Sequence, residues 1–220
     1  MLFLKALMYV NFTFILNNKG VYSQLMYLMT IIKKIFRIIL KVIFKFDWWH
    51  TSPLDNRPYA LDIIAELNKK SDKGAVLELG CGLGDIIGKV KYQNKYFFDI
   101  SINVLKAAQF VQLVSLKKSI DTFLVFDFLK DSIDLDIELD AIVLVNWIHA
   151  CDGKILKKKI SNLVNSNLKK DGILIFDLIE ENNTYKHNHV LSDLIEIELY
   201  TVCVSDKYRF GRRIVYASLK

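Results

Sequence analysis

The chain has 220 residues and a mass of 25.5 kDa, which suits one domain of ordinary size with a short extension. Hydrophobic residues make up 52% of it and charged residues 25%, so a core can be buried and wholesale disorder is excluded. Three scattered cysteines argue against a disulfide framework and lack the spacing of zinc ligands. We therefore expect a reducing, cytoplasmic environment and no metal.

The positive charge is concentrated at the N-terminal end. The formal net charge is +6, and residues 1–50 account for all of it, with seven basic residues against one acidic residue. Residues 51–220 contain 23 basic and 23 acidic residues and are neutral. A pI near 9.0 would normally suggest a nucleic-acid partner, but a neutral main domain argues against one. Any anionic partner is expected to bind the N-terminal segment.

Residues 25–46 are predicted to form an amphipathic helix that lies on an anionic membrane surface. The segment has no Gly or Pro, and its cations recur at positions 33, 37, 41 and 45, with Lys34 beside the first. Its length would suit a membrane span, but each of these five cations would cost about 2.5–3.5 kcal/mol near the bilayer centre. Lying at the interface costs less, because lysines reach the headgroups. The alternative is a helix whose broad apolar face packs on the main domain.

Residues 1–24 are apolar but weakly patterned. They indicate either a second hydrophobic segment or an upstream start codon at Met1, with Met26 or Met29 as the true initiator. The predicted division of the chain is a membrane-associating extension, a lid or lead-in helix, and a main domain. Their bounds are residues 1–46, 47–73 and 74–220.

From residue 75 onward, apolar runs alternate with helical segments. Strands are predicted over residues 75–79, 95–100, 122–128, 140–147 and 173–179, and helices over residues 103–116 and 154–168. Continuous apolar strands separated by helices indicate an α/β protein with a parallel sheet covered on both faces. Two final runs, residues 195–204 and 213–219, predict an antiparallel hairpin that closes the sheet.

The sharpest motif is a predicted strand that leads into Gly80, Gly82 and Gly84 and then into a predicted helix. Glycines at these positions let the backbone turn tightly and let a ligand approach the main chain. Glu78, at the end of the strand, would repel a pyrophosphate but suits a cationic or hydroxyl-bearing ligand. Asp99 ends the next strand, where an acid can hydrogen-bond a ribose. An ordinary glycine-rich turn is the alternative for the glycines alone.

The pattern Glu-x-Gly-x-Gly-x-Gly, then Tyr-Phe-Phe-Asp-Ile-Ser with a following V-L-x-x-A helix, resembles the class I S-adenosylmethionine-dependent methyltransferase family. The similarity extends from about Ala75 to Ile179. It implies an enzyme with a Rossmann-like, doubly wound, seven-stranded methyltransferase fold over residues 74–220. It also implies S-adenosyl-L-methionine as the cofactor. The acid before the first glycine separates this pattern from nicotinamide binders, in which a pyrophosphate must pass there.

The resemblance assigns cofactor contacts to residues near the ends of the first four strands. These residues are Glu78, Gly80, Cys81, Gly82, Gly84, Asp99, Ile100, Asp127, Phe128 and Asn146. The glycines and Cys81 would line the methionine and ribose parts, and Glu78 would help to hold the amino group. Asp99 would accept the ribose hydroxyls, with Ile100 packed on the adenine. Asp127 would bind the adenine amino group with Phe128 beside it, and its alternative role is a turn or helix-cap residue.

Two histidines are candidates for catalysis. Asn146-Trp147-Ile148-His149 departs from the Asn/Asp-Pro-Pro-Tyr form of amino-group methyltransferases, which weakens a nucleobase or amide acceptor. An alcohol acceptor gains from a nearby base, so His149 is the first candidate and His50 is its rival. The alternative for His149 is a helix cap or a packed residue under a loop. Arg57, Tyr59 and Trp147 are predicted to contact the substrate, the first two from a lid that begins at the adjacent tryptophans Trp48 and Trp49. The alternative for these tryptophans is that they anchor the end of the amphipathic helix at the membrane interface.

The basic helix, the small domain and the W-H…R-P-Y lead-in together resemble bacterial methyltransferases linked to surface-polysaccharide biosynthesis. This implies O-methylation of a sugar or terminal phosphate group of a glycan, by a protein peripheral to the inner face of the membrane. One alternative acceptor is a lipid or quinone-like small molecule. The other alternative is a non-catalytic, cofactor-binding, membrane-anchored subunit. The expected partners are therefore a glycan or other small-molecule acceptor and an anionic membrane surface.

Overall fold

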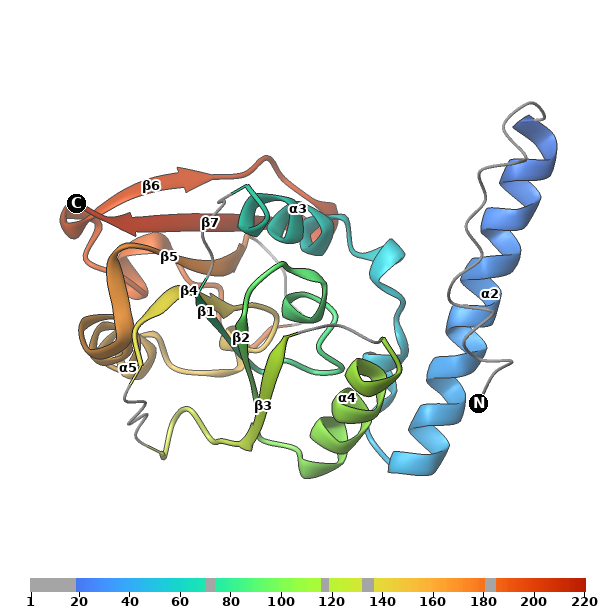
Figure 1. Ribbon diagram of the computed structural model, residues 1–220. Helices are drawn as coiled ribbons and strands as arrows, with labels where there is room; N and C mark the ends of the chain where they lie inside the picture. Colours follow the sequence, from blue (N-terminus) through green and yellow to red (C-terminus); the bar gives the residue numbers. More distant parts are fainter. Residues whose placement is uncertain (1–18, 70–73, 116–118, 132–136, 181–184) are drawn as a thin grey trace.

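The computed structural model describes residues 19–69, 74–115, 119–131, 137–180 and 185–220. In these residues the chain forms one twisted sheet with helices on both faces and a long helix at one side (Figure 1). The prediction of a second hydrophobic segment over residues 1–24 falls mostly outside the described residues.

The sheet has seven strands in the order β3-β2-β1-β4-β5-β7-β6, with β7 antiparallel to β5 and β6. The strands are β1 (Ala75–Leu79), β2 (Asn94–Asp99), β3 (Ile120–Val125), β4 (Leu139–Leu144), β5 (Leu168–Ile179), β6 (Tyr200–Val204) and β7 (Arg212–Leu219). The first five are parallel, so their carboxyl ends meet at one edge. The predicted α/β fold, a mostly parallel sheet closed by an antiparallel hairpin, is confirmed.

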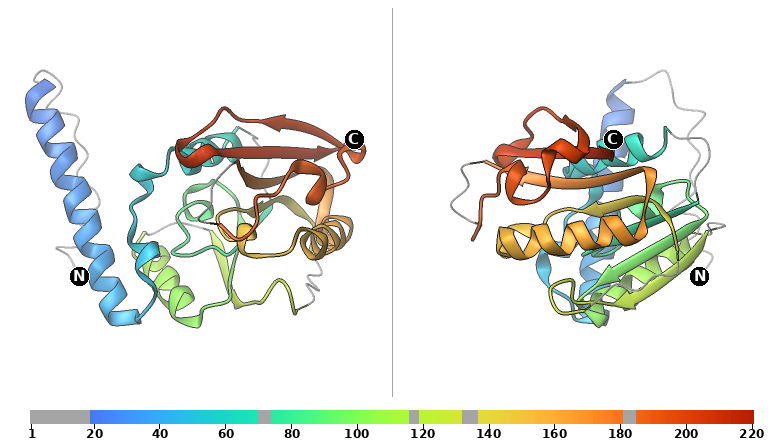
Figure 2. Two further views of the ribbon diagram at one scale, coloured as in Figure 1. Left: turned by 180° about the vertical axis from the view of Figure 1, so that it is seen from behind. Right: turned by 90° about the vertical axis from the view of Figure 1, so that its left-hand side faces the viewer.

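Different helices cover the two faces of the sheet (Figure 2). The helices are α2 (Lys19–Phe44), α3 (Pro58–Leu67), α4 (Ile102–Val114) and α5 (Gly153–Asn167). Leu77 of β1 packs in one core with Leu156 of α5, and Val76 packs in the other with Ile63 of α3 and Leu105 of α4. Because successive strand residues point to opposite faces, a strand buried on both sides must be apolar throughout.

One predicted element is wrong and another is too long. The glycine motif is followed by a single 3₁₀ turn, Ile87–Lys89, instead of an α-helix, because residues 85–93 are all that link Gly84 to β2. The strand predicted over residues 195–204 begins only at Tyr200, because Ile197–Leu199 forms a 3₁₀ turn. An apolar run alone does not distinguish a short strand from a turn that packs its side chains.

α2 packs on the domain through one face of its C-terminal half. Leu40 is 1% exposed and shares a small core with Phe46, which follows the helix, and with Leu83. Two cations on the same face bind acids of the domain. Lys33 Nζ lies 2.5 Å from Asp55 Oδ2, and Arg37 pairs with Asp85. These two were predicted to face headgroups, so that part of the prediction is wrong. Among the described helices, none has the length and apolarity to cross a membrane.

A matched pair of variants tests this docking. Leu40→Ala should lower the free energy of unfolding by about 2–5 kcal/mol, because it leaves a cavity between α2 and the domain. Val42→Ala, two residues on but 71% exposed, should change it by less than about 0.5 kcal/mol. Urea denaturation of the full chain measures both. Equal values would mean that α2 does not dock as described.

Candidate active site

The glycine motif forms a tight loop between β1 and the 3₁₀ turn. Gly80, Gly82 and Gly84 have φ values of 70°, 54° and 70°, a region that glycine adopts at no steric cost. The amides of Gly80 and Cys81 both donate to the carbonyl of Phe98 in β2, at 2.8 and 3.0 Å. The loop is therefore fixed to the neighbouring strand, at the edge where the parallel strands end.

Asp99 ends β2 and turns its carboxylate toward this loop. Its Oδ2 accepts the Gly82 amide at 3.0 Å, and its Oδ1 accepts the Ser101 amide at 2.9 Å. Each carboxylate oxygen has about two lone-pair sites, so both can accept a further hydrogen bond. Ile100, the next residue, is 67% exposed. The acid and the apolar side chain predicted for ribose and adenine thus lie side by side at the glycine loop.

Glu78 lies in β1 beneath the loop and is buried. Its Oε2 accepts the amide of Ile87 at 3.3 Å, which fixes the 3₁₀ turn. Burial raises the pKa of this carboxyl to about 8, so it is protonated at neutral pH. A contact between Glu78 and a cofactor amino group stays a prediction.

The end of β3 carries Asp127, which the structure places in a turn. Its Oδ1 accepts the amide of Leu129 at 3.1 Å, and its Oδ2 lies 3.0 Å from Lys130 Nζ. The hydrogen bond from Lys130 lowers the pKa of Asp127, so the carboxyl is ionised. Phe128 is buried and packs against Trp147, with ring centroids 5.5 Å apart. The turn is the alternative that we gave for Asp127, and its adenine role stays a prediction.

The lead-in segment lies over the loop. The 3₁₀ turn Trp48–Thr51 brings the half-buried His50 to Gly82, where a Cβ built on the glycine would be 3.0 Å from His50 Nδ1. Burial lowers the pKa of His50, so the imidazole is neutral at pH 7. The function of this segment as a lid stays a prediction.

An ion-pair cluster fixes the lead-in segment to the loop. Asp85, directly after Gly84, pairs with both Arg37 of α2 and Arg57 of the lead-in segment. Arg37 also donates to the carbonyls of His50 and Ser52, at 3.1 and 2.8 Å. Burial would raise the pKa of Asp85, but Arg57 and Arg37 outweigh it and lower the pKa. Arg57, predicted to contact substrate, is therefore bound to the glycine loop.

Asn146 and Trp147 follow β4 at the same edge. Asn146 has a φ of 79°, a strained conformation that asparagine tolerates better than most residues, and its Oδ1 accepts the Tyr59 hydroxyl at 2.8 Å. Trp147 donates from Nε1 to the carbonyl of Leu79 at 2.6 Å. Its indole covers Gly80, where any Cβ would collide with it. Tyr59 thus stands beside Asn146, after β4, where the methyl acceptor is predicted, and we call this region the acceptor side. Trp147 belongs to the glycine loop.

His149 is fully buried behind Asn146. Its Nε2 lies 3.2 Å from Asp177 Oδ2, and Asp177 also pairs with Arg212. Burial, and after it the Arg212 cation, lower the pKa of His149 to about 4, so the imidazole is neutral. In this arrangement the ring does not line the opening of the site. Its role as a base stays a prediction.

Sequence reasoning missed Asp177 and Arg212. Asp177 Oδ1 accepts the amide of Asn146 at 3.0 Å, and Arg212 lies over the ring of Tyr59 at 4.7 Å. Both residues therefore support the acceptor side. The available signal was an acid inside the apolar run of residues 173–179 in β5, because a fully buried acid requires partners.

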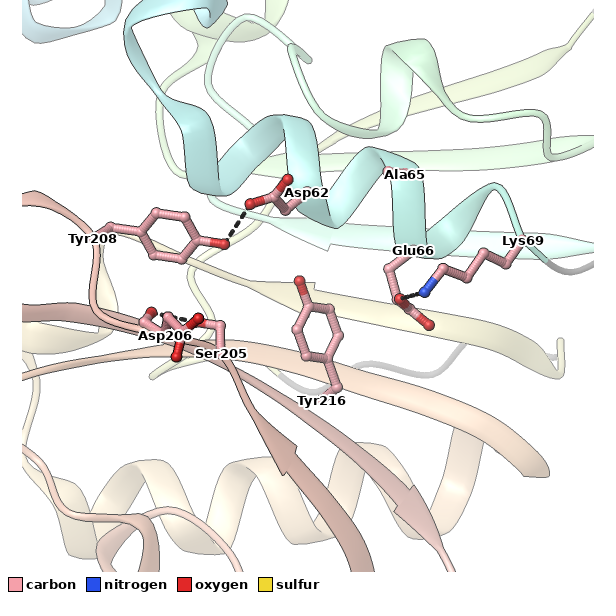
Figure 3. Close-up of a pocket in the computed structure, with 8 residues that line it drawn as sticks. All are labelled: Asp62, Ala65, Glu66, Lys69, Ser205, Asp206, Tyr208 and Tyr216. Carbon is pink, nitrogen blue, oxygen red and sulfur yellow. Dashed lines mark hydrogen bonds and ion pairs between the residues drawn. The ribbon is translucent and has the colours of Figure 1, made fainter.

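A polar pocket of about 460 Å³ lies between α3 and the β6–β7 hairpin (Figure 3). It is lined by Asp62, Ala65, Glu66, Lys69, Ser205, Asp206, Tyr208 and Tyr216. The Tyr208 hydroxyl donates to Asp62 Oδ2 at 2.6 Å, and its ring packs on Tyr59 at 6.1 Å. The pocket is thus joined to the acceptor side through two tyrosines.

The fold of this chain recurs in solved structures. Magnesium protoporphyrin IX methyltransferase (ChlM) from Synechocystis PCC 6803, with bound SAM, covers 76% of this chain and 81% of its own, at a TM-score of 0.59 and 18% identity. The N-methyltransferase NodS from Bradyrhizobium japonicum WM9, in complex with S-adenosyl-L-homocysteine, aligns with 82% of this chain and with 96% of its own length. The TM-score is 0.60 and the sequence identity is 17%. The fold is that of the class I methyltransferases. The sequence itself matches no family model and no curated protein.

The buried acid of this methyltransferase fold predicts a pH effect. The folded state keeps the Glu78 proton up to about pH 8, whereas the unfolded state loses it near 4.5. Glu78 therefore costs stability as the pH rises between these values. Relative to the wild type, Glu78→Gln should gain on the order of a few kcal/mol between about pH 5 and pH 8. Urea denaturation at both pH values measures the gain. A difference that is independent of pH would contradict the raised pKa.

Proposed function

We propose that the chain is an S-adenosylmethionine-dependent methyltransferase. The observation that carries the proposal is the carboxylate of Asp99, 3.0 Å from the Gly82 amide in a glycine loop of this fold. The solved structures that share the fold include ones with bound SAM and S-adenosyl-L-homocysteine. This supports the proposal, because a carboxylate at that position suits ribose hydroxyls.

The residues present fit the cofactor. Asp99 would hold the ribose through its free lone pairs, and Ile100 offers an exposed apolar surface for the adenine. The left-handed backbone at Gly80 and Gly82 would let the methionine part lie against the loop. When bound, the cofactor supplies a methyl group on a sulfonium, which a hydroxyl oxygen can attack in line.

For the acceptor we propose a sugar hydroxyl of a glycan. The pocket of Figure 3 supports this choice, because carboxylates such as Asp62 and Asp206 accept hydroxyl hydrogens but repel a phosphate. Tyr208 and Tyr216 add flat apolar faces of the kind that pack on sugar rings. Tyr208 of the pocket packs on Tyr59, and the Tyr59 hydroxyl donates to Asn146, near which the transferred methyl group is expected.

His50 is the better placed of the two candidate bases. It lies at Gly82 and is neutral at pH 7, so it can accept a proton from an acceptor hydroxyl. His149 is buried behind Asn146 and contacts Asp177, which holds the Asn146 amide. We therefore assign His149 a positioning role.

Loss of the Asp99 carboxylate tests the cofactor assignment. Hydrogen bonds to a charged group are worth about 1.5–3 kcal/mol each, so Asp99→Ala should weaken S-adenosylmethionine binding at least about tenfold. Asp171→Asn, an exposed acid at the start of β5, is the matched control and should bind as the wild type does. Isothermal titration calorimetry gives both affinities. Unchanged affinity in Asp99→Ala would refute the ribose assignment.

The acceptor class is tested by following labelled methyl groups from S-adenosylmethionine into oligosaccharide, phospholipid and quinone fractions. Label in the oligosaccharide fraction supports a glycan acceptor, and label only in either other fraction contradicts it. Binding of cofactor without transfer to any fraction would favour the non-catalytic subunit.

With the labelled acceptor, His50→Gln should lower kcat by about 10²–10⁴-fold if His50 accepts the proton. The wild-type rate should fall as the pH drops through the lowered pKa of His50, because protonation removes the base, and the variant should lack this dependence. His149→Gln should lower the stability more than it changes the pH profile. A wild-type rate in His50→Gln, with an altered pH profile in His149→Gln, would return the role of base to His149.

A further inference from the structure

Over its last five turns, α2 has a docking face, an exposed apolar face and a row of lysines. The first is the docking face, where Phe36 and Leu40 pack on the domain and Arg37 pairs with Asp85. At 3.6 residues per turn, the opposite side of the helix points away from the domain. That side is exposed and apolar: it consists of Leu28, Ile31, Ile35, Ile38, Ile39, Val42 and Ile43.

The exposed apolar face continues into two aromatic residues. Trp48 and Trp49 follow the helix directly and are 71% and 57% exposed. Large apolar side chains rarely gather on the surface of a monomer without a partner. Tryptophan is enriched where a protein meets the boundary between hydrocarbon and water. The face and its aromatic end therefore indicate a lipid surface more than an aqueous one.

Lysines border this face. Lys34 and Lys45 are exposed and Lys41 is half-buried, and none of the three pairs with an acid among the described residues. The other two cations of the segment, Lys33 and Arg37, are held by the domain. Residues 51–220 are neutral overall and do not offset this charge. Among the described residues, these three lysines therefore provide unpaired positive charge beside the apolar face.

We propose that α2 binds an anionic lipid bilayer, such as the inner face of a membrane. Its exposed apolar face enters the headgroup boundary, the three lysines lie at headgroup level, and Trp48 and Trp49 sit at the interface. Apolar burial supplies attraction that salt does not screen, and the lysines supply attraction that salt weakens. The helix lies on the bilayer, in keeping with the cations along its length.

The docking of α2 also sets how the domain meets the bilayer. The helix packs on Leu83, which follows β1, and on Val104 of α4, which follows β2. Both positions lie at the edge where the parallel strands end, and Figure 1 shows α2 beside α4. Binding would therefore bring this edge near the membrane. The ion pairs of Asp85 with Arg37 and Arg57 would fix the angle between α2 and the domain. If the proposed function holds, a lipid-linked glycan would be presented to the glycine loop.

The test is flotation of the full chain with vesicles of phosphatidylcholine alone or with one quarter phosphatidylglycerol. Wild-type protein should float with the anionic vesicles, more weakly at high salt, and two of its three tryptophans should shift their emission to the blue. K34Q/K41Q/K45Q should weaken this binding about 100-fold at low salt, since each cation is worth about fivefold. I35S/V42S should abolish it.

Matched variants outside α2 serve as controls. K154Q/K158Q/K170Q removes three lysines, and I120S/I155S removes two exposed isoleucines. Both should bind vesicles as the wild type does. Wild-type binding by I35S/V42S, or no wild-type binding to either vesicle, would overturn the proposal. So would a dimer that I35S/V42S dissociates, because a second copy would then cover the face. None of these readouts depends on methyl transfer, so the failure of one proposal does not decide the other.

Discussion

Asp85 joins three parts of the chain that are far apart in the sequence. Its carboxylate directly follows the glycine motif, and its two partners come from α2 and from the segment that leads into α3. Removing ionised side chains from water is costly, so such a cluster persists only when all its members are paired. The guanidinium of Arg37 also holds the carbonyls of His50 and Ser52. Ion pairs and hydrogen bonds therefore join the glycine loop, the lead-in segment and α2 into one unit.

A second buried acid plays the same part on the other side of the site. Asp177 is completely buried in β5, yet it contacts the Asn146 amide, the His149 ring and Arg212. The strained backbone of Asn146 is thus supported from within the sheet. The surface in front of it is formed by Tyr59, which rests on Arg212. A polar cluster inside the core thus fixes the positions of Asn146 and Tyr59.

The segment that precedes the sheet contributes more to the protein than an anchor would. Leu40 and Phe46 are buried, so the last part of the N-terminal extension belongs to the packed structure. Its docking covers Leu83, which follows β1, and Val104, which follows β2. One helix thus carries a face that completes the domain and an opposite apolar face that the domain leaves uncovered.

The sequence by itself determined the sheet, the glycine loop and Asp99. Buried parallel strands must be continuously apolar, and positive φ favours glycine, so both leave local signals in the chain. Only the tertiary structure decided which cations face the domain, because Lys33 and Lys34 look alike in a sequence but differ by one helical step. Likewise, the sequence predicts His149 as a base after a strand. Only the fold shows that its ring lies beside Asp177, which pairs with Arg212, and both of these residues are far along the chain. Such partners are set by long-range packing, which leaves no local pattern.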